Sequence, residues 1–215
     1  MPDLAGLIDR VERGEWLPPD PWLSLVPAPA PETSAVVGFA GHVVVAADLD
    51  PAWVRGQLPD RDLSAPLNPP FLGALERRLD RRVNNLDLLL LAPASPGEPV
   101  LSLTEVPELD HPRVRRARRY REWVRIWAGD GGVLVLGSGL AGRWEAAIEV
   151  EPARRGRGLG RALAQAARQL VPDRRPVWAQ VAPANAASVR AFLAAGYHPA
   201  GAEALLVPRT LGGCG

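Results

Sequence analysis

The sequence predicts an α/β fold, and two patterns in its second half support this prediction. First, three apolar runs of strand type follow one another with only short glycine-containing turns between them, as consecutive antiparallel strands do. Second, a glycine-rich turn separates the last run from an amphipathic helical pattern, and strand and helix patterns then alternate once more. We expect strands at 123–127, 133–136, 143–150, 177–181 and 204–207, and helices at 159–170 and directly after Asn185.

The first half of the chain has strand and helix patterns but no motif that names a function. We therefore interpret residues 1–105 as a divergent N-terminal part, either a module that shapes an acceptor site or a degenerate second copy of the fold that follows. Residues 106–208 form the expected core, and 209–215 a frayed tail. The patterns of the first half predict short helices within 1–15, 51–54 and 71–79, an extended proline-rich linker at 17–32, and strands within 35–47, 86–91 and 100–106.

The charged residues are balanced, because 25 basic and 24 acidic side chains give a net charge of +1. This balance argues against a nucleic-acid partner for the chain as a whole. No apolar run is long enough to span a membrane and no signal-peptide pattern is visible, so we expect no membrane association and a cytoplasmic location. Every basic residue is arginine, which fits a GC-rich bacterial genome.

Neither cysteine nor histidine predicts a reactive or metal site. The single cysteine, Cys214, lies in a glycine-rich tail, where it is a poor nucleophile candidate and has no internal disulfide partner. The three histidines, His42, His111 and His198, lack the spacing of metal ligands, so we expect no metal.

An arginine-rich helix is expected over residues 111–121, with Val114, Ala117 and Tyr120 on one side. A solvated helix face explains this pattern best, because the chain as a whole is not basic. Two alternatives stay open: a contact with a cofactor phosphate, and nucleic-acid binding by the segment from Arg113 to Arg125.

The glycine-rich turn, residues 155–161, has the sequence Arg-Gly-Arg-Gly-Leu-Gly-Arg and stands between a strand and a helix. The first backbone N–H groups of a helix have no partner inside it, and the helix dipole adds partial positive charge at that end. Glycines let an anion approach the main chain closely. The turn is therefore a candidate phosphate site, formed by Arg155, Gly156, Arg157, Gly158, Leu159, Gly160 and Arg161.

This turn resembles the pyrophosphate-binding signature of the GNAT superfamily of acyl-CoA-dependent N-acyltransferases, Gln/Arg-x-x-Gly-x-Gly/Ala, through Arg155, Gly158 and Gly160. A second GNAT landmark follows in the same order: a strand, then Asn185, Ser188, a helix and a closing Gly-Tyr pair. The resemblance implies that the Asn185 side chain hydrogen-bonds the pantetheine arm of the cofactor and that the Ser188 hydroxyl reaches the cofactor. Both residues also have a local interpretation, as the N-cap and first turn of a helix.

The resemblance implies a mixed, mostly antiparallel sheet flanked by helices, and an acetyl-CoA-dependent N-acetyltransferase. The acceptor would be a primary amine of a small molecule or peptide that attacks directly, and a homodimer is left open. The alternative is a GNAT-like acyl-CoA-binding protein with little or no turnover, which serves as a sensor or partner module.

The resemblance also implies where the chemistry takes place. Backbone N–H groups near Ile148 to Val150 would polarise the thioester carbonyl at the point where two strands separate. Glu145 and Glu149 share side-chain parity on the same strand, so both are candidates to deprotonate the amine. Many family members have a tyrosine where this chain has Phe192, which has no proton to give to the departing thiolate.

Overall fold

The computed structural model describes residues 3–209 of the chain. Contacts divide these residues into two compact units, one made of 3–88 together with 200–209, the other of 89–199. The long strands β4 (Arg81–Ala92) and β10 (His198–Pro208) each run from one unit into the other along the chain. The strand patterns at 86–91 and 204–207 are parts of these two strands, so both strands were expected too short.

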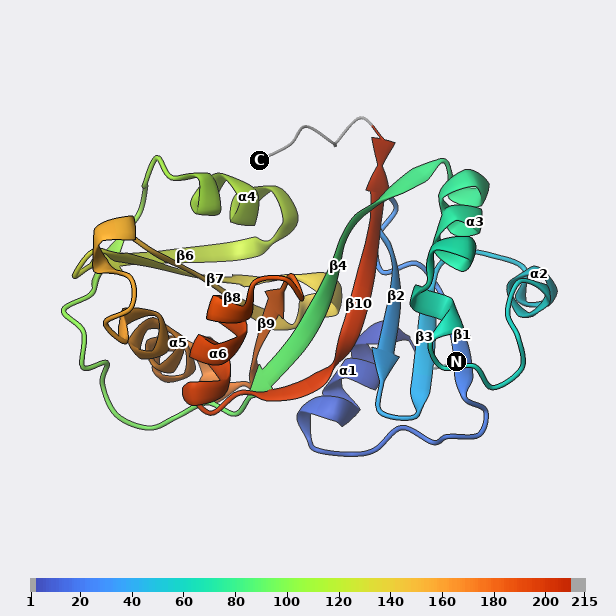
Figure 1. The fold of residues 1–215 in the computed structure, drawn as a ribbon, viewed down its shortest axis with the longest axis horizontal. Coiled ribbons are helices and arrows are strands. Elements are labelled where there is room, and N and C mark those ends of the chain that lie inside the picture. The colour runs from blue at the N-terminus through green and yellow to red at the C-terminus, as the bar shows by residue number, and fades with distance from the viewer. Residues whose placement is uncertain (1–2, 210–215) are drawn as a thin grey trace. The chain divides into compact units, whose positions relative to one another are not determined.

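The first unit is built on a sheet in the order β1-β3-β2-β10-β4, in which β2 and β3 form a hairpin (Figure 1). Its apolar core includes Val36 and Val45 of the sheet and Phe71 and Leu75 of α3. The other elements of this unit are α1 (Leu4–Glu12), β1 (Leu23–Val26), β2 (Ser34–Phe39), β3 (His42–Ala46), α2 (Pro51–Gly56) and α3 (Pro69–Leu79).

Two stretches of the chain differ from the sequence expectation. The proline-rich stretch 17–32 contains strand β1, which pairs in parallel with β3 so that Leu23 lies opposite Val43. A tertiary pairing of this kind overrides the local proline signal, which marks only the residues around the strand. The expected strand at 100–106 shortens to β5 (Thr104–Val106), the only part of it that pairs with β6.

The second unit is a sheet in the order β9-β8-β7-β6-β5, with helices on both faces. All neighbours are antiparallel except β8 and β9, which are parallel. The fold class expected from the sequence, a mixed and mostly antiparallel sheet flanked by helices, is confirmed. Its elements besides β5 are α4 (Pro112–Tyr120), β6 (Glu122–Gly129), β7 (Gly132–Ser138), β8 (Trp144–Val150), α5 (Leu159–Leu170), β9 (Val177–Val181) and α6 (Ala186–Ala194).

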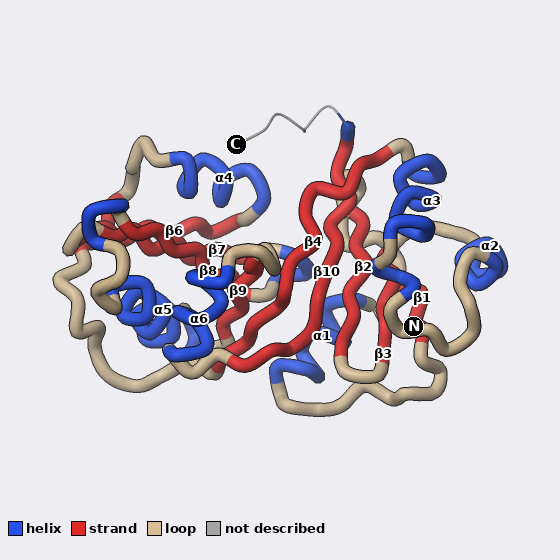
Figure 2. Tube along the Cα trace, viewed as in Figure 1, coloured by secondary structure: helices blue, strands red, loops and turns tan. Residues whose placement is uncertain are grey.

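The two faces of this sheet are covered by different helices (Figures 1 and 2). Val114 and Ala117 of α4 pack with Ile126 and Val135, and Ala147 of β8 borders the same cluster. On the other face lies α5, whose buried residues include Leu163, Ala164, Ala166 and Ala167. Residues of β8 therefore alternate between the α4 face and the α5 face.

Candidate active site

The glycine-rich turn joins the end of β8 to the start of α5 and is exposed to solvent. Gly158 is the N-cap residue, with a left-handed φ of 82°, a conformation that glycine adopts without steric cost. It has no side chain to cap the helix, and a Cβ at Gly156 or Gly158 would meet no atom within 4 Å. The N–H groups of the first turn of α5 therefore open towards free space, as an anion site requires.

The arginines of this turn are not equivalent. The Arg155 guanidinium folds back onto β8, where its Nε donates to the carbonyl of Val150 at 3.1 Å and its Nη2 to Glu149 at 3.2 Å. Arg157 and Arg161 are exposed beside the start of the helix. The structure thus places all seven predicted phosphate-site residues together, but with Arg155 already engaged.

Strands β8 and β9 pair over only three residues, from Trp144 opposite Val177 to Ala146 opposite Ala179. From Ala147 onwards β8 keeps its antiparallel partner β7 but has no partner residue on β9. The side chains from Ala147 to Val150 are half-buried, in contrast to Glu145 and Ala146. The two strands separate beside Ile148 and Val150, where an extended ligand can bind to main-chain groups.

Helix α6 lies against α5. Its N-cap is Asn185, whose side-chain oxygen accepts a hydrogen bond from the Ser188 N–H at 3.1 Å. A Cβ on Gly160 of α5 would touch Ala191 of α6 at 3.5 Å, so the two helices are close at this point. Asn185 therefore acts as an N-cap in the structure, as its local interpretation predicted. The cap uses only the side-chain oxygen, so the NH₂ group of the amide can bind another partner.

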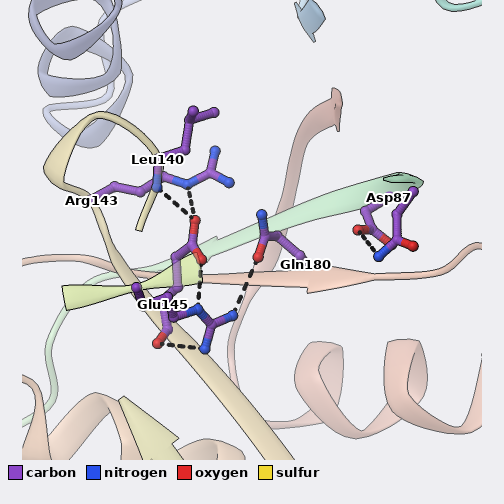
Figure 3. Close-up of polar contacts among 7 residues, drawn as sticks. Asp87, Leu140, Arg143, Glu145 and Gln180 are labelled. Atoms are coloured by element: carbon purple, nitrogen blue, oxygen red, sulfur yellow. Dashed lines mark hydrogen bonds and ion pairs between the residues drawn. The ribbon is translucent and has the colours of Figure 1, made fainter. Parts of the chain in front are cut away.

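Glu145 is buried on β8, with 3 % of its surface exposed, between two arginines (Figure 3). Its carboxylate accepts from Arg143 Nε and from Arg121 Nε, both at 2.8 Å, and from the Leu140 N–H at 3.3 Å. Burial alone would raise the pKa of this carboxyl, but the charges of Arg143 and Arg121 outweigh it and hold the pKa below its ordinary value. A carboxylate that is ionised and fully engaged is a poor proton acceptor.

Arg121 also connects the two strands that separate. Its guanidinium donates to the side chain of Glu145, to the Glu145 carbonyl at 3.4 Å and to Gln180 of β9 at 3.3 Å. Gln180 is the first residue of β9 beyond the segment that pairs with β8. The Glu145 cluster therefore stabilises the junction at which β8 and β9 part.

Glu149 lies on the same face of β8 but is accessible, with 32 % of its side chain exposed. Its two oxygens are held separately, one by Arg113 of α4 at 2.6 Å and the other by Arg155 at 3.2 Å. Partial burial would raise the pKa of Glu149, but the hydrogen bond and charge of Arg113 and the charges of Arg155 and His111 lower it. Of the two predicted carboxylates, Glu149 is the one that a ligand at the open end of β8 could reach.

Phe192 and Tyr197 pack against each other, with ring centroids 4.9 Å apart and an edge-to-face geometry. Both are buried, and the Tyr197 hydroxyl donates to the Ala164 carbonyl at 3.3 Å. Burial raises the pKa of Tyr197 far above its usual range. Neither ring therefore offers a proton to a departing thiolate.

The arginine-rich helix α4 is partly neutralised by the acidic segment before it. Arg115 pairs with Asp110, Arg118 pairs with Glu108, and Arg125 on β6 pairs with Glu105. These contacts agree with the interpretation of α4 as a solvated helix face.

Metal sites and membrane-spanning helices can be assessed for residues 3–209. Among them no group of three or more histidine, cysteine or acidic side chains has the arrangement of a metal site. None of the helices in this range is both long and apolar enough to cross a bilayer. Cys214 lies outside the described residues, so its predicted lack of a role stays a prediction.

Sequence reasoning missed the partners of the two glutamates. Arg113 and Arg121 were visible only as members of an arginine-rich run, and Arg143 only as the first residue of an expected strand. No local sequence pattern distinguishes an arginine that pairs with an exposed acidic side chain from an arginine that is buried in the core.

The family model of the Acetyltransferase (GNAT) family matches residues 101–197. Comparison with curated proteins gives no match. Among solved structures, the chain is similar to a GCN5-related N-acetyltransferase from Kribbella flavida, with 19 % identity over 67 % of this chain and 65 % of that one, and a TM-score of 0.40. It is also similar to a GCN5-related N-acetyltransferase from Sphaerobacter thermophilus, with 18 % identity over 65 % of this chain and 56 % of that one, and a TM-score of 0.38. The present chain thus covers less than two thirds of the length of either structure.

Proposed function

We propose that the chain is an N-acetyltransferase that transfers an acetyl group from acetyl-CoA to a primary amine of a small molecule or peptide, and the match of residues 101–197 to the GNAT family model supports this proposal. The observation that best supports the proposal is the separation of β8 from β9 directly beside the open N-terminus of α5. The separated strands can bind an extended arm, and the helix N-terminus can bind a diphosphate. Coenzyme A contains such an arm joined to a diphosphate.

The diphosphate would bind at the glycine-rich turn. Gly156 and Gly158 leave room for its oxygens to approach the N–H groups of the first turn of α5, and the helix dipole favours the negative charge. Arg157 and Arg161 add formal positive charge. Arg155 can reach the same anion if it releases Glu149.

The pantetheine arm would then lie along the unpaired part of β8. Main-chain groups between Ile148 and Val150 can hydrogen-bond it as a neighbouring strand would, and one of their N–H groups would polarise the thioester carbonyl. The side-chain NH₂ group of Asn185 and the hydroxyl of Ser188 are the candidate contacts from α6.

The acceptor amine must lose a proton when its nitrogen attacks the carbonyl carbon. The new C–N bond then forms as the C–S bond breaks and the thiolate leaves. Glu149 is the group that we assign to the amine, either as proton acceptor or as the partner of the ammonium form. Since a thiol has a pKa of about 8.5, the thiolate can leave without an enzyme acid, which is consistent with Phe192 in place of tyrosine. We expect direct attack and no covalent intermediate on Cys214.

Phe192 also favours a second candidate function, a GNAT-like acyl-CoA-binding protein with little or no turnover, because it removes the usual proton donor of the family. Calorimetric titration with coenzyme A tests what both functions share, and no binding would overturn both. Thiol release from acetyl-CoA across a panel of amines separates them. Amine-dependent release supports the enzyme, whereas binding without release on a broad panel supports the second function.

A further inference from the structure

Arg113 of α4 reaches across to β8, unlike Arg115 and Arg118, which pair with acidic residues that precede the helix. Its Nη2 donates to Glu149 at 2.6 Å, on the unpaired part of β8. Among residues 3–209, Glu149 is the only partner of the Arg113 side chain. The other N–H groups of this guanidinium are therefore left for a ligand.

The position of Arg113 is fixed by the start of α4. The Arg113 N–H donates at 3.1 Å to Nδ1 of His111, which is the N-cap residue, and Pro112 begins the helix. The helix dipole adds partial positive charge at this end. A guanidinium with N–H groups to spare, held in the first turn of a helix, is suited to bind a carboxylate.

Glu149 supplies the opposite charge directly beside this guanidinium. Its Oε2 accepts from Arg113, and its Oε1 accepts from Arg155 at 3.2 Å. In the proposed function Arg155 moves to the diphosphate, which frees Oε1. A carboxylate and a guanidinium then stay side by side, with 32 % and 37 % of their side chains exposed, so that both are partly shielded from water.

Such a pair is complementary to a molecule that carries an amine and a carboxylate close together. An α-amino acid carries both on one carbon atom. A polyamine or a lysine side chain brings only positive charge, and the N-terminus of a peptide has an amide in place of the carboxylate. Of the amines that the proposed function allows, the free amino acid matches both charges.

We propose that the acceptor is a free α-amino acid, whose carboxylate binds Arg113 while its amine binds Glu149. The inference rests on the proposed function and names its acceptor. Two protons leave the α-ammonium as the C–N bond forms and the C–S bond breaks. Glu149 takes the first, and the second passes from the attacking nitrogen to the departing thiolate, so the products are an N-acetylamino acid and the thiol.

Thiol release from acetyl-CoA with matched acceptors tests the inference on the full chain. Each standard L-amino acid is compared with its own amide, which keeps the side chain but lacks the negative charge. For the best amino acid, kcat/KM should exceed that of its amide at least about tenfold, the size of one charge-assisted contact. Amine basicity acts in the other direction, because the amine of the amide is less basic and loses its proton more readily.

Variants of Arg113 separate specificity from a general loss of activity. Arg113→Ala should bring the ratio of acid to amide towards one, mainly by raising KM for the amino acid. Arg113→Lys should restore part of the ratio, because it keeps the charge but not the planar fork. Arg115→Ala, which removes a neighbouring arginine that pairs with Asp110, should keep the full ratio. A loss of rate in Arg113→Ala that is equal for acid and amide would overturn the inference.

The same panel separates the inference from the proposed function. Equal kcat/KM for amino acids and their amides would overturn the inference while the proposed function stands. So would release with spermidine or with a lysine-containing peptide but with no amino acid. If coenzyme A binds but none of these amines gives release, the proposed acetyl transfer and the inference fall together.

Discussion

Glu145 and Glu149 share one face of β8, yet their surroundings give them different roles. Alternation along a strand predicts which side chains share a face, and it predicted this pair. It does not predict how deeply each side chain is buried, because burial depends on the elements that pack against that face of the strand. Arg121 and Arg143 enclose Glu145, whereas Glu149 lies near the open end and is held by Arg113 and Arg155.

We predict that Glu145→Gln destabilises the protein by about 3–5 kcal/mol, because it leaves two buried guanidinium groups without their counter-charge. Unfolding in urea, followed by circular dichroism, measures the change in free energy. Glu105→Gln is the matched control: it removes one carboxylate from an exposed pair with Arg125 and should cost less than about 1 kcal/mol. If Glu145→Gln keeps full stability but loses turnover, Glu145 is a catalytic residue after all.

The same carboxylate predicts a dependence of stability on pH. The pKa of Glu145 is lower in the folded protein than its ordinary value, so its charge stabilises the fold fully above the unfolded pKa. This contribution is lost as the pH falls through the folded pKa. The difference in unfolding free energy between the unchanged protein and Glu145→Gln should therefore be constant near neutral pH and shrink only in acid. A difference that shrinks between pH 8 and pH 6 would contradict this assignment.

For Glu149 we predict an effect on turnover. Glu149→Gln should lower kcat by a factor of about 100 or more, the usual contribution of a general base. Affinity for coenzyme A should not fall, because the substitution frees Arg155 for the diphosphate. Steady-state kinetics and calorimetry measure the two quantities, with Glu122→Gln, a change at an exposed residue of β6, as the control. An unchanged kcat would exclude Glu149 from the proton transfer.

At the scale of elements, local patterns located α5 and β9 correctly, at 159–170 and 177–181. Both have strong periodicity and are bounded by glycine or proline. The same patterns did not locate the segment that lies against α5, because it comes some seventy residues earlier in the chain and is fixed by hydrogen bonds such as Gln165 to Ser95. Contacts between distant segments leave no trace in a local pattern.

The junction of α5 with the glycine-rich turn gives a test at this scale. Gly160→Ala should leave coenzyme A binding and stability almost unchanged, because its Cβ would make ordinary contacts with Ala191 at 3.5 Å and Val150 at 3.8 Å. Gly160→Glu should abolish binding, since it brings a carboxylate to the first turn of α5, where the diphosphate would bind. Calorimetry with both variants gives the comparison, and circular dichroism confirms folding. Full affinity in a folded Gly160→Glu variant would contradict the diphosphate site.

At the scale of the whole molecule, the last strand of the chain pairs with one of the first strands. Ala204 of β10 lies opposite Val36 of β2, which returns the end of the chain to the first unit. Sequence patterns predicted strands at both places but could not reveal that they pair with each other. By contrast, the glycine-rich turn and the unpaired part of β8 both come from the single stretch 89–199.

This division predicts where coenzyme A protects the backbone from hydrogen exchange. Saturation at 100 times the dissociation constant stabilises the binding-competent state by about 2.7 kcal/mol, and the protection should concentrate in the residues that bind. Exchange measured by mass spectrometry should therefore slow in peptides that cover 148–162. Peptides from 3–80 should exchange at the same rate with and without coenzyme A. Protection mainly in 3–80 would place the coenzyme in the first unit and contradict the diphosphate site at α5.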